Sequence, residues 1–506
     1  MEKQQYILNL PLKQMALRKV AIVLWHQADI LAHVKSFRCQ SLTCDSTIQQ
    51  WQKSVENVVK EKVSMLLLPD SLKEELVHVM KPIGPEILKW KLHHESLISD
   101  SYFALDQLFW TSVGTVDYRK TAEIFIRQER ITIVSSYKLA CIYCLDDHIR
   151  VIWEKLSEDS KKLFYDEENI LQIRQPELVV FWTYLIRGEV AKLDVLINRN
   201  NNGERERTVY QYAFESAATS GNKAATEYFF QKLTLEEREA SLLETAQSLT
   251  DKRCFDGYSY TYDLQTQNFC DVLCYLLSQM KEEEQMQVFK KHPYKTLRCF
   301  MDWPWQDLFM KVVAFQWSFL RDDEYKWLMG ILSQNRTMSG YNYPKLFGEL
   351  FLHSPSRYRK YIIDQHRVYG FWFRNLIYGG HTEIIKLVLR NVDDKDRQGF
   401  IICETGFHLS WRLIEEGKWF LLDLFVSECR LSSEAKTILK NSFMRYVARF
   451  YKECQNKLRR HKWERFFQLI DNANVNDGNK RIIEEAEKEE QSISNKPKRK
   501  RRRRKF

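Results

Sequence analysis

Residues 373–389 read FRNLIYGGHTEIIKLVL, and this stretch decides the fold that we infer from the sequence. Before Gly380, apolar residues recur at helical spacing from Phe373 to Ile377, and after it a second apolar stripe runs from Ile384 to Leu389. A glycine between two such stripes suits a helix end, because glycine adopts positive φ without strain. The stretch therefore predicts a helical hairpin, two short helices joined by a tight turn.

The same unit recurs around three other glycines, Gly188, Gly221 and Gly417. When the first two are aligned with Gly380 without gaps, a phenylalanine lies seven positions before each glycine, at Phe181, Phe214 and Phe373. Three apolar residues lie seven to nine positions after each glycine, at 195–197, 228–230 and 387–389. Around Gly417, apolar residues lie at 413–414 and 424–426. The repetition predicts several similar hairpins in one chain, with the glycines as their turns.

The residues around Gly221 and Gly380 resemble the ankyrin repeat. Phe214-x-x-Ala217-Ala218-x-x-Gly221 is similar to the first helix and turn of that family, and GHTEIIKL from Gly380 is similar to its second helix. Gly188 and Gly221 lie 33 residues apart, which is the period of the family. The resemblance implies an α-solenoid of stacked hairpins that presents a long surface to a protein partner.

The resemblance is limited to residues 181–230 and 373–426. The T-P-L-H motif of the family is absent, and Gly380 and Gly417 lie 37 residues apart. Between Gly221 and Gly380 only the three-apolar endings can be traced, at 275–277, 327–329 and 361–363, and an earlier ending lies at 151–153. The predicted architecture is therefore an array of degenerate repeats. The alternative is a helical-hairpin solenoid of another kind, in which the glycines recur by chance.

Composition agrees with an all-α chain. Of 506 residues only 16 are Gly and 10 are Pro, and 44% are hydrophobic, so breakers are few and a large core can form. We divide the chain into an N-terminal helical region with repeat-like fragments (1–175), an ankyrin-like repeat domain (176–475) and an acidic helix followed by a disordered basic tail (476–506). In the first region we expect helices over 10–35 and 48–62. A further helix should begin at Asp70 and stop at Pro82 and the Gly84-Pro85 pair.

The sharpest functional signal is a basic run at the end of the sequence. Nine of the ten residues 496–505 are Lys or Arg, so removing them lowers the net charge from +10 to +1. The run resembles a basic nuclear import signal and implies an import receptor as a partner. Its basic residues are Lys496, Lys498, Arg499, Lys500, Arg501, Arg502, Arg503, Arg504 and Lys505. The alternatives are contact with RNA or DNA, attraction to anionic lipid, or neutralisation by the acidic residues 484–490.

A second basic segment lies at 444–465, where eight Lys or Arg residues fall in one predicted helix. Such a helix beside a basic tail is able to contact phosphates, and it is also typical of the solvated face of a last repeat. No RNP-like aromatic motif accompanies it.

Sequence motifs of catalysis and metal binding are weak. Cys141, Cys144 and His148 fall on one helical face, but a structural zinc site usually needs four ligands, and no second C-x-x-C pair exists. Cys270 and Cys274 are less informative, His93-His94-Glu95 is not an H-E-x-x-H motif, and the resemblance implies a structural role for His381. Phosphate-binding glycine loops and nucleophile elbows are also absent. We therefore predict a non-enzymatic protein without metal or cofactor.

The 11 cysteines show no paired spacing, residues 1–10 lack a secretory signal, and the apolar window 20–25 is too short to span a membrane. These features predict an intracellular protein, located in the nucleus because of the tail, with the cytoplasm as the alternative. The first functional hypothesis is a protein-interaction or scaffold protein that uses the solenoid surface. The second is a nuclear protein whose basic tail contacts nucleic acid.

Overall fold

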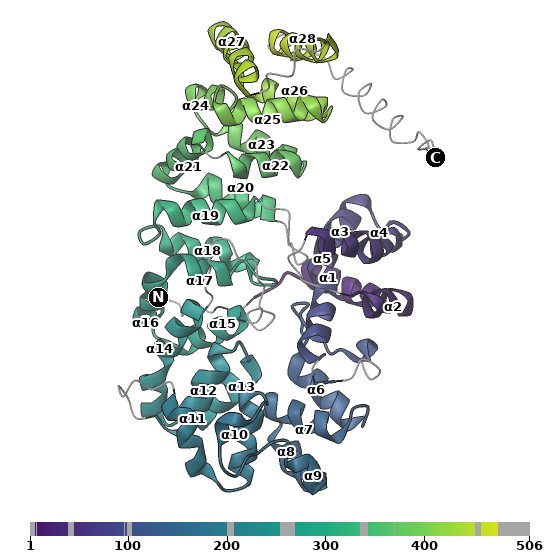
Figure 1. Ribbon diagram of the computed structural model, residues 1–506, viewed down its shortest axis with the longest axis vertical. Helices are drawn as coiled ribbons and strands as arrows, with labels where there is room; N and C mark the ends of the chain where they lie inside the picture. The colour runs from purple at the N-terminus through teal and green to yellow at the C-terminus, as the bar shows by residue number, and fades with distance from the viewer. Residues whose placement is uncertain are drawn as a thin grey trace, which may run out of the picture. The chain divides into compact units, whose positions relative to one another are not determined.

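The computed structural model describes residues 6, 8–38, 45–95, 97–98, 104–199, 207–252, 269–333, 343–368, 370–450 and 457–473. The described part of the chain is 76% helical, which confirms the all-α prediction (Figure 1). In the described residues there is no strand, only an isolated bridge between Trp110 and Val116. The chain forms two compact units, unit 1 (Met1–Arg321 with Arg336–Asn342) and unit 2 (Asp322–Asn335 with Tyr343–Phe506).

Unit 1 contains the elements from α1 to α18. They are α1 (Leu12–Trp25), α2 (Ala28–Ser36), α3 (Asp45–Trp51), the π-helical η1 (Gln52–Glu56), α4 (Asn57–Ser64), α5 (Asp70–His94), the 3₁₀ turn η3 (Leu105–Gln107), α6 (Tyr118–Arg127), α7 (Ile133–Ile142), α8 (Asp146–Lys155), α9 (Glu158–Lys161), the 3₁₀ turn η4 (Ile170–Gln172), α10 (Glu177–Ile186), the 3₁₀ turn η5 (Val190–Leu193), α11 (Asp194–Arg199), α12 (Val209–Thr219), α13 (Lys223–Lys232), α14 (Leu235–Lys252), α15 (Phe269–Gln279), α16 (Glu282–Lys291), α17 (Pro293–Cys299) and α18 (Gln306–Gln316).

Unit 2 contains the remaining helices. They are α19 (Asp322–Leu332), α20 (Tyr343–His353), α21 (Ser356–Val368), α22 (Phe371–Tyr378), α23 (Thr382–Arg390), α24 (Asp394–Gly399), α25 (Glu404–Glu415), α26 (Trp419–Glu428), α27 (Ser433–Phe450) and α28 (Lys457–Asn472).

Local sequence explains where several helices begin. Thr208 caps α12 in a capping box, in which its hydroxyl accepts from the backbone N–H of Gln211 (3.2 Å) and the Gln211 side chain accepts from the N–H of Thr208 (3.0 Å). The side chain of Asn222 accepts from the N–H of Ala225 (3.1 Å) and so starts α13 directly after the turn. These caps satisfy amide groups that a helix leaves without an internal partner.

The expectation that α5 stops at Pro82 and Gly84-Pro85 is wrong, because the helix runs unbroken from Asp70 to His94. Its residues from Pro82 to Lys91 are all buried, so tertiary packing outweighs the hydrogen bonds that the two prolines remove. Trp25 packs against α5 beside Gly84. Its indole N–H donates to the carbonyl oxygen of Met80 (3.0 Å), and its ring occupies the space that a Cβ at Gly84 would need.

Two other predicted helices are divided in the structure. The segment 10–35 forms α1 and α2, which are separated at His26 and Gln27. The segment 444–465 is not one helix, because α27 and α28 pack against each other, with the ring centroids of Phe443 and Phe466 4.9 Å apart. Seven of the eight basic residues of 444–465 are therefore divided between two helices, Arg445 and Arg449 on α27 and the other five on α28, and Lys452 lies outside the described residues. The segment 48–62 is helical as expected, with a π-helical turn in its middle.

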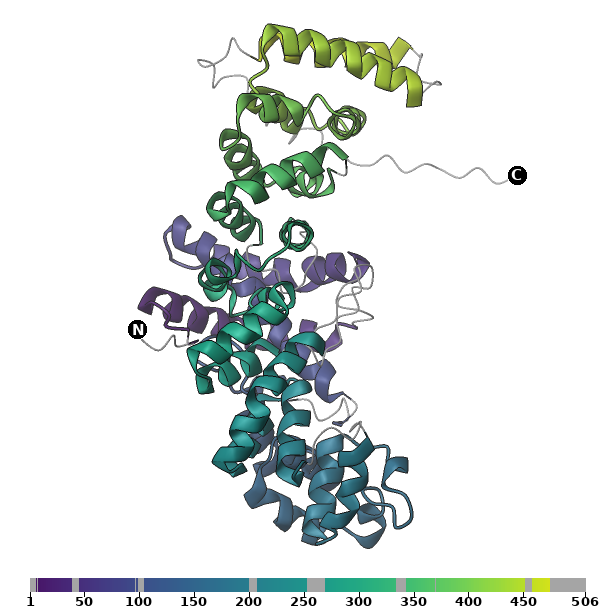
Figure 2. The same ribbon diagram turned by 90° about the vertical axis from the view of Figure 1, so that its left-hand side faces the viewer.

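The first and last elements of unit 1 are in contact with each other. The hydroxyl of Tyr6 donates to Gln285 (3.3 Å), and its ring packs on Phe289. Arg18 is 1% exposed and pairs with Asp307 (3.3 Å), while its guanidinium lies 4.4 Å from the ring centre of Trp303. Figure 2 shows the purple N-terminal helices beside the teal helices of the same unit. Unit 1 therefore differs from an open array, in which a repeat contacts only its neighbours.

Candidate functional site

The four predicted glycine turns share one hydrogen-bond pattern. Gly188, Gly221, Gly380 and Gly417 have φ of 74°, 76°, 72° and 71°. In each turn the N–H after the glycine donates to the carbonyl five residues earlier: Glu189 to Tyr184 (3.0 Å), Asn222 to Ala217 (3.0 Å), His381 to Leu376 (3.0 Å) and Lys418 to Leu413 (2.9 Å). This is the Schellman motif, which ends a helix with a left-handed residue. Each glycine thus lies in the turn between two helical segments, as the sequence predicts.

A fifth turn of this kind lies at Cys144, which the sequence analysis missed. Cys144 has φ of 50°, and the N–H of Leu145 donates to the carbonyl of Ala140 (2.9 Å). This turn joins α7 to α8, and the apolar ending traced at 151–153 lies seven to nine positions after Cys144. That trace was the available signal, but the turn carries cysteine where the alignment required glycine.

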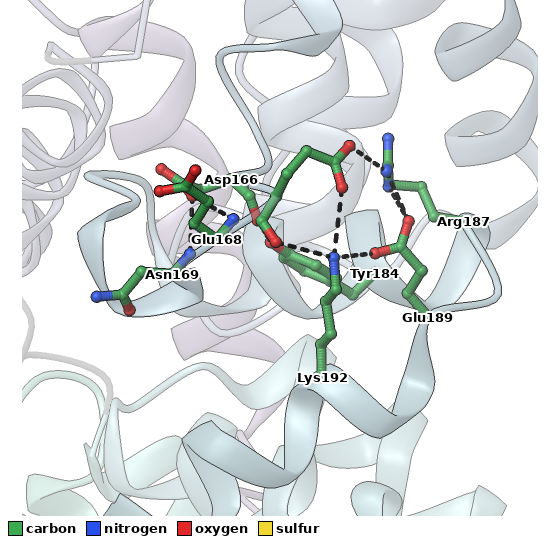
Figure 3. Close-up of polar contacts among 8 residues, drawn as sticks. Asp166, Glu168, Asn169, Tyr184, Arg187, Glu189 and Lys192 are labelled. Carbon is green, nitrogen blue, oxygen red and sulfur yellow. Dashed lines mark hydrogen bonds and ion pairs between the residues drawn. The ribbon is translucent and has the colours of Figure 1, made fainter.

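Charged side chains fix the turn at Gly188 (Figure 3). Arg187 donates to Glu189 (2.6 Å) and Glu167 (2.8 Å), and Lys192 donates to the same two carboxylates (2.8 and 3.4 Å). The hydrogen bond from Lys192 and the contact with Arg187 hold the pKa of Glu189 below its usual value, although desolvation opposes them. Two cations and two carboxylates thus satisfy one another. We interpret the network as a brace of the turn.

Side chains also join one hairpin to another in each unit. In unit 1, the side chain of Asn222 donates to the carbonyl of Ile142 (2.7 Å), and the hydroxyl of Tyr228 donates to Asp146 (3.1 Å). The α12–α13 hairpin therefore lies beside the α7–α8 hairpin. In unit 2, Arg390 of α23 donates to Glu428 of α26 through Nε (2.9 Å) and Nη2 (2.5 Å), so the second helices of two successive hairpins are neighbours.

Unit 1 contains a cleft of ≈ 1210 Å³. Its lining comes from the N-terminal residues Tyr6 and Leu8, from residues 111–113 and 115–120, from the Gly221 turn and the start of α13, and from α5, α7, α10, α12, α15 and the segment before α18. Its polar and charged lining includes Asp117, Arg119, Lys120, Glu177, Ser216, Ser220, Asn222, Lys223, Glu227 and Asp271, and its apolar lining includes Leu92, Leu178 and Tyr275. The turn predicted at Gly221 is therefore part of the wall.

Both signs of charge face this cleft. Burial raises the pKa of Asp271, against the effects of Lys223 and of the indole N–H of Trp305, which donates to its carboxylate (2.5 Å). Burial also raises the pKa of Glu227, against the effects of Lys223 (3.7 Å) and Arg119. Arg119 and Lys223 are exposed. The cleft can therefore contact both polar and charged groups of a ligand.

Of the cysteines and histidines considered as metal ligands, the four cysteines and His94 are part of the packed core, whereas His93, His148 and His381 are half-buried. Cys141 and Cys144 are buried, and burial raises the pKa of each thiol, which disfavours the thiolate that binds zinc. His94 is fully buried, where its ring nitrogens contact the Trp90 carbonyl (2.8 Å) and the Tyr143 hydroxyl (2.7 Å). His381 packs against Gly379 in the turn. Across the described ranges, no group of three or more His, Cys, Asp or Glu residues could hold a metal ion.

The basic residues proposed as an import signal, Lys496 to Lys505, lie outside the described residues, as does the whole segment 476–506. Within the part of the chain that the structure describes, no helix has the length and apolar character needed to cross a membrane.

Comparison with known proteins found no matching family model, no matching curated protein and no matching solved structure. In its described residues the chain is an all-helical protein with recurring hairpin turns and a large cleft in unit 1. The resemblance to ankyrin repeats therefore depends only on the sequence around Gly221 and Gly380.

Proposed function

We propose that this chain is a non-enzymatic protein-interaction protein that holds a segment of its partner in the cleft of unit 1. The carrying observation is the size of that cleft, ≈ 1210 Å³. Sites for small molecules usually measure about 300–1,000 Å³. A larger hollow lined by hydroxyls, an amide and charges of both signs suits a polypeptide, whose backbone and side chains offer matching groups.

We further propose that the hairpins are degenerate ankyrin-like repeats and that part of the chain is an α-solenoid. This proposal is supported by the recurrence of the same turn at five places, each followed seven to nine positions later by three apolar residues. The neighbouring second helices α23 and α26 support it as well. The contacts between the two ends of unit 1 distinguish this protein from an open array of repeats.

A photo-crosslinking amino acid at Ser220 tests the cleft directly. We expect the full-length protein to form one dominant crosslinked product with a partner in cells. Arg119→Glu should reduce that product several-fold, because it places a like charge near Glu227 and Asp117 and changes the groups offered to the ligand. Lys155→Glu on α8 makes the same charge change at an exposed residue that is not part of the cleft wall, and should leave the product intact. Equal crosslinking in the two variants would refute the cleft as the binding site.

We also propose that residues 496–505 direct the protein to the nucleus. Nine like charges in ten residues repel one another and leave almost no apolar side chain, so the run suits an extended peptide on a receptor. At 60.8 kDa the chain is large enough that an active signal should matter. Residues 491–506 fused to a large cytoplasmic reporter should bring it into the nucleus, and deleting them should leave the protein mainly cytoplasmic. Replacing the nine basic residues by Ala in the fusion is the control. A reporter at the plasma membrane would point to lipid instead.

The second candidate function is nucleic-acid association through the same basic run. Nine cations are enough to contact several phosphates, and such binding should weaken steeply as salt rises. Full-length protein and protein lacking 496–506 can be compared on one RNA at two salt concentrations. Binding that disappears with the tail supports this function, whereas a cleft-bound partner should remain after the deletion.

A further inference from the structure

Two pairs of side chains face each other across successive hairpins of unit 2. Arg374 and Tyr378 lie four residues apart on α22, and His408 and Arg412 lie four residues apart on α25, so each pair shares one helix face. The guanidinium of Arg412 lies 5.5 Å from the ring centre of Tyr378. Both helices run toward neighbouring glycine turns, so we infer from the contact of Tyr378 with Arg412 that Arg374 and His408 lie together one helical turn earlier. We call Arg374, Tyr378, His408, Arg412, Glu416 and Lys418 the Tyr378 cluster.

The Tyr378 cluster has more positive than negative charge. Its only carboxylate, Glu416, contacts Lys418 (3.0 Å), Arg412 (3.3 Å) and the hydroxyl of Tyr378 (3.4 Å). The Lys418 ammonium also lies 4.4 Å from the Tyr378 ring centre. Among the described residues, the Arg374 guanidinium has no hydrogen bond or ion pair. The Tyr378 cluster therefore contains three permanent cations and one carboxylate, and the side chains of Arg412 and Lys418 are 48% and 39% exposed.

The pKa of His408 is affected by the positive charges of the cluster. Its Nδ1 contacts the hydroxyl of Tyr446 (3.1 Å), and no partner of Nε2 is present in the described part of the chain. Partial burial, then the charges of Arg412 and Arg374, lower the pKa of His408. Two guanidinium groups thus act on this imidazole, and no carboxylate is among the groups that shift it. An anion bound between the two arginines would relieve the repulsion and offer an acceptor to the imidazole.

We propose that the Tyr378 cluster binds a phosphate monoester on a protein partner, such as a phosphorylated serine. The inference rests on the proposed protein-interaction function and names the chemistry of the partner. A phosphate dianion matches the two net positive charges, and its oxygens can accept paired N–H groups from arginine. A polynucleotide is disfavoured, because such binding usually depends on a row of phosphate contacts and this cluster is compact.

Binding of degenerate peptide pools tests the assignment. Full-length protein is applied to pools with a central phosphoserine, to the same pools with serine, and to a 20-nucleotide oligouridine. We expect the phosphorylated pool to bind about tenfold more tightly than the serine pool. Arg374→Gln and Arg412→Gln should each remove that preference, whereas Arg374→Lys should retain part of it. Arg390→Gln is the matched control, since this exposed arginine pairs with Glu428 on α26.

Equal binding of the two pools, or a phosphate preference that both Gln variants retain, would overturn the proposal. Tighter binding of the oligouridine that depends on Arg374 and Arg412 would also overturn it and assign the cluster to nucleic acid. Circular dichroism of each variant shows whether the fold is intact. The crosslink at Ser220 in unit 1 separates this inference from the proposed function: if Arg119-dependent crosslinking persists without phosphate preference, only the inference fails. If crosslinking fails while phosphopeptide binding persists, the cleft proposal fails.

Discussion

Replacing Phe373 by alanine is expected to lower the free energy of unfolding of unit 2 by about 3–5 kcal/mol. Phe373 is 0% exposed, and its ring packs on those of Trp372, Phe400 and Phe425 at centroid distances of 5.5, 4.9 and 5.4 Å. Truncation would leave a cavity among rigid rings that cannot collapse into it, and so the cost should lie in the range of large core deletions. Urea unfolding followed by circular dichroism measures the change.

Phe420 on α26 provides the matched control, because the same truncation removes a ring that is 40% exposed. We expect Phe420→Ala to change the unfolding free energy by about 1 kcal/mol or less. Equal effects of the two substitutions would show that the alignment on Gly380 has placed Phe373 incorrectly in the core.

Gly84→Ala is expected to destabilise unit 1 by about 2–3 kcal/mol, although alanine is the better helix former. A Cβ at this position would lie 2.2 Å from Cζ2 of Trp25. The indole cannot easily move, because its N–H is bonded to Met80 and its ring stacks on Trp51 at 5.9 Å. Steric overlap should therefore exceed the gain in helix propensity. The midpoint of urea unfolding is the measurement.

Gly348 in α20 is the control that separates steric overlap from the gain in helix propensity. A Cβ added at Gly348 would lie 3.1 Å from the terminal methyl group of Ile384, and this methyl group can rotate away. We expect Gly348→Ala to be neutral or stabilising by up to about 1 kcal/mol. A stabilising effect at Gly84 as well would contradict the packing that we describe around Trp25.

The turns could be predicted from sequence because a residue with left-handed backbone conformation is usually glycine. The glycines at 188, 221, 380 and 417 therefore indicate the turn positions directly. Cys144 escaped because a side chain can adopt this conformation at a cost of about 1–2 kcal/mol when the surrounding packing compensates. The length of α5 could not be predicted from the local sequence for a related reason. Prolines end helices by local rules, and the contact that offsets them comes from Trp25, more than 50 positions earlier.

The two candidate sites could not be predicted, because neither is local in sequence. The cleft takes its lining from residues between Tyr6 and Trp305, and its charges carry no shared motif. Arg374 and Arg412 stand among ordinary residues, and only the stacking of two hairpins brings them together. The dense basic segments are conspicuous in the sequence instead, and of these 444–465 belongs to two helices.

The contacts that join the two ends of unit 1 also set a condition on its biosynthesis. The bond from Tyr6 to Gln285 spans 279 positions, and that from Arg18 to Asp307 spans 289. At about 5–20 residues per second, a ribosome needs roughly 15–60 s to make that length of chain. During this interval the nascent N-terminal helices lack their final partners, and Leu12, Met15 and Val23 of α1 stay exposed even in the finished fold. A nascent chain of this kind is a natural client for chaperones, and its folding yield should depend on them more strongly than that of an open repeat array.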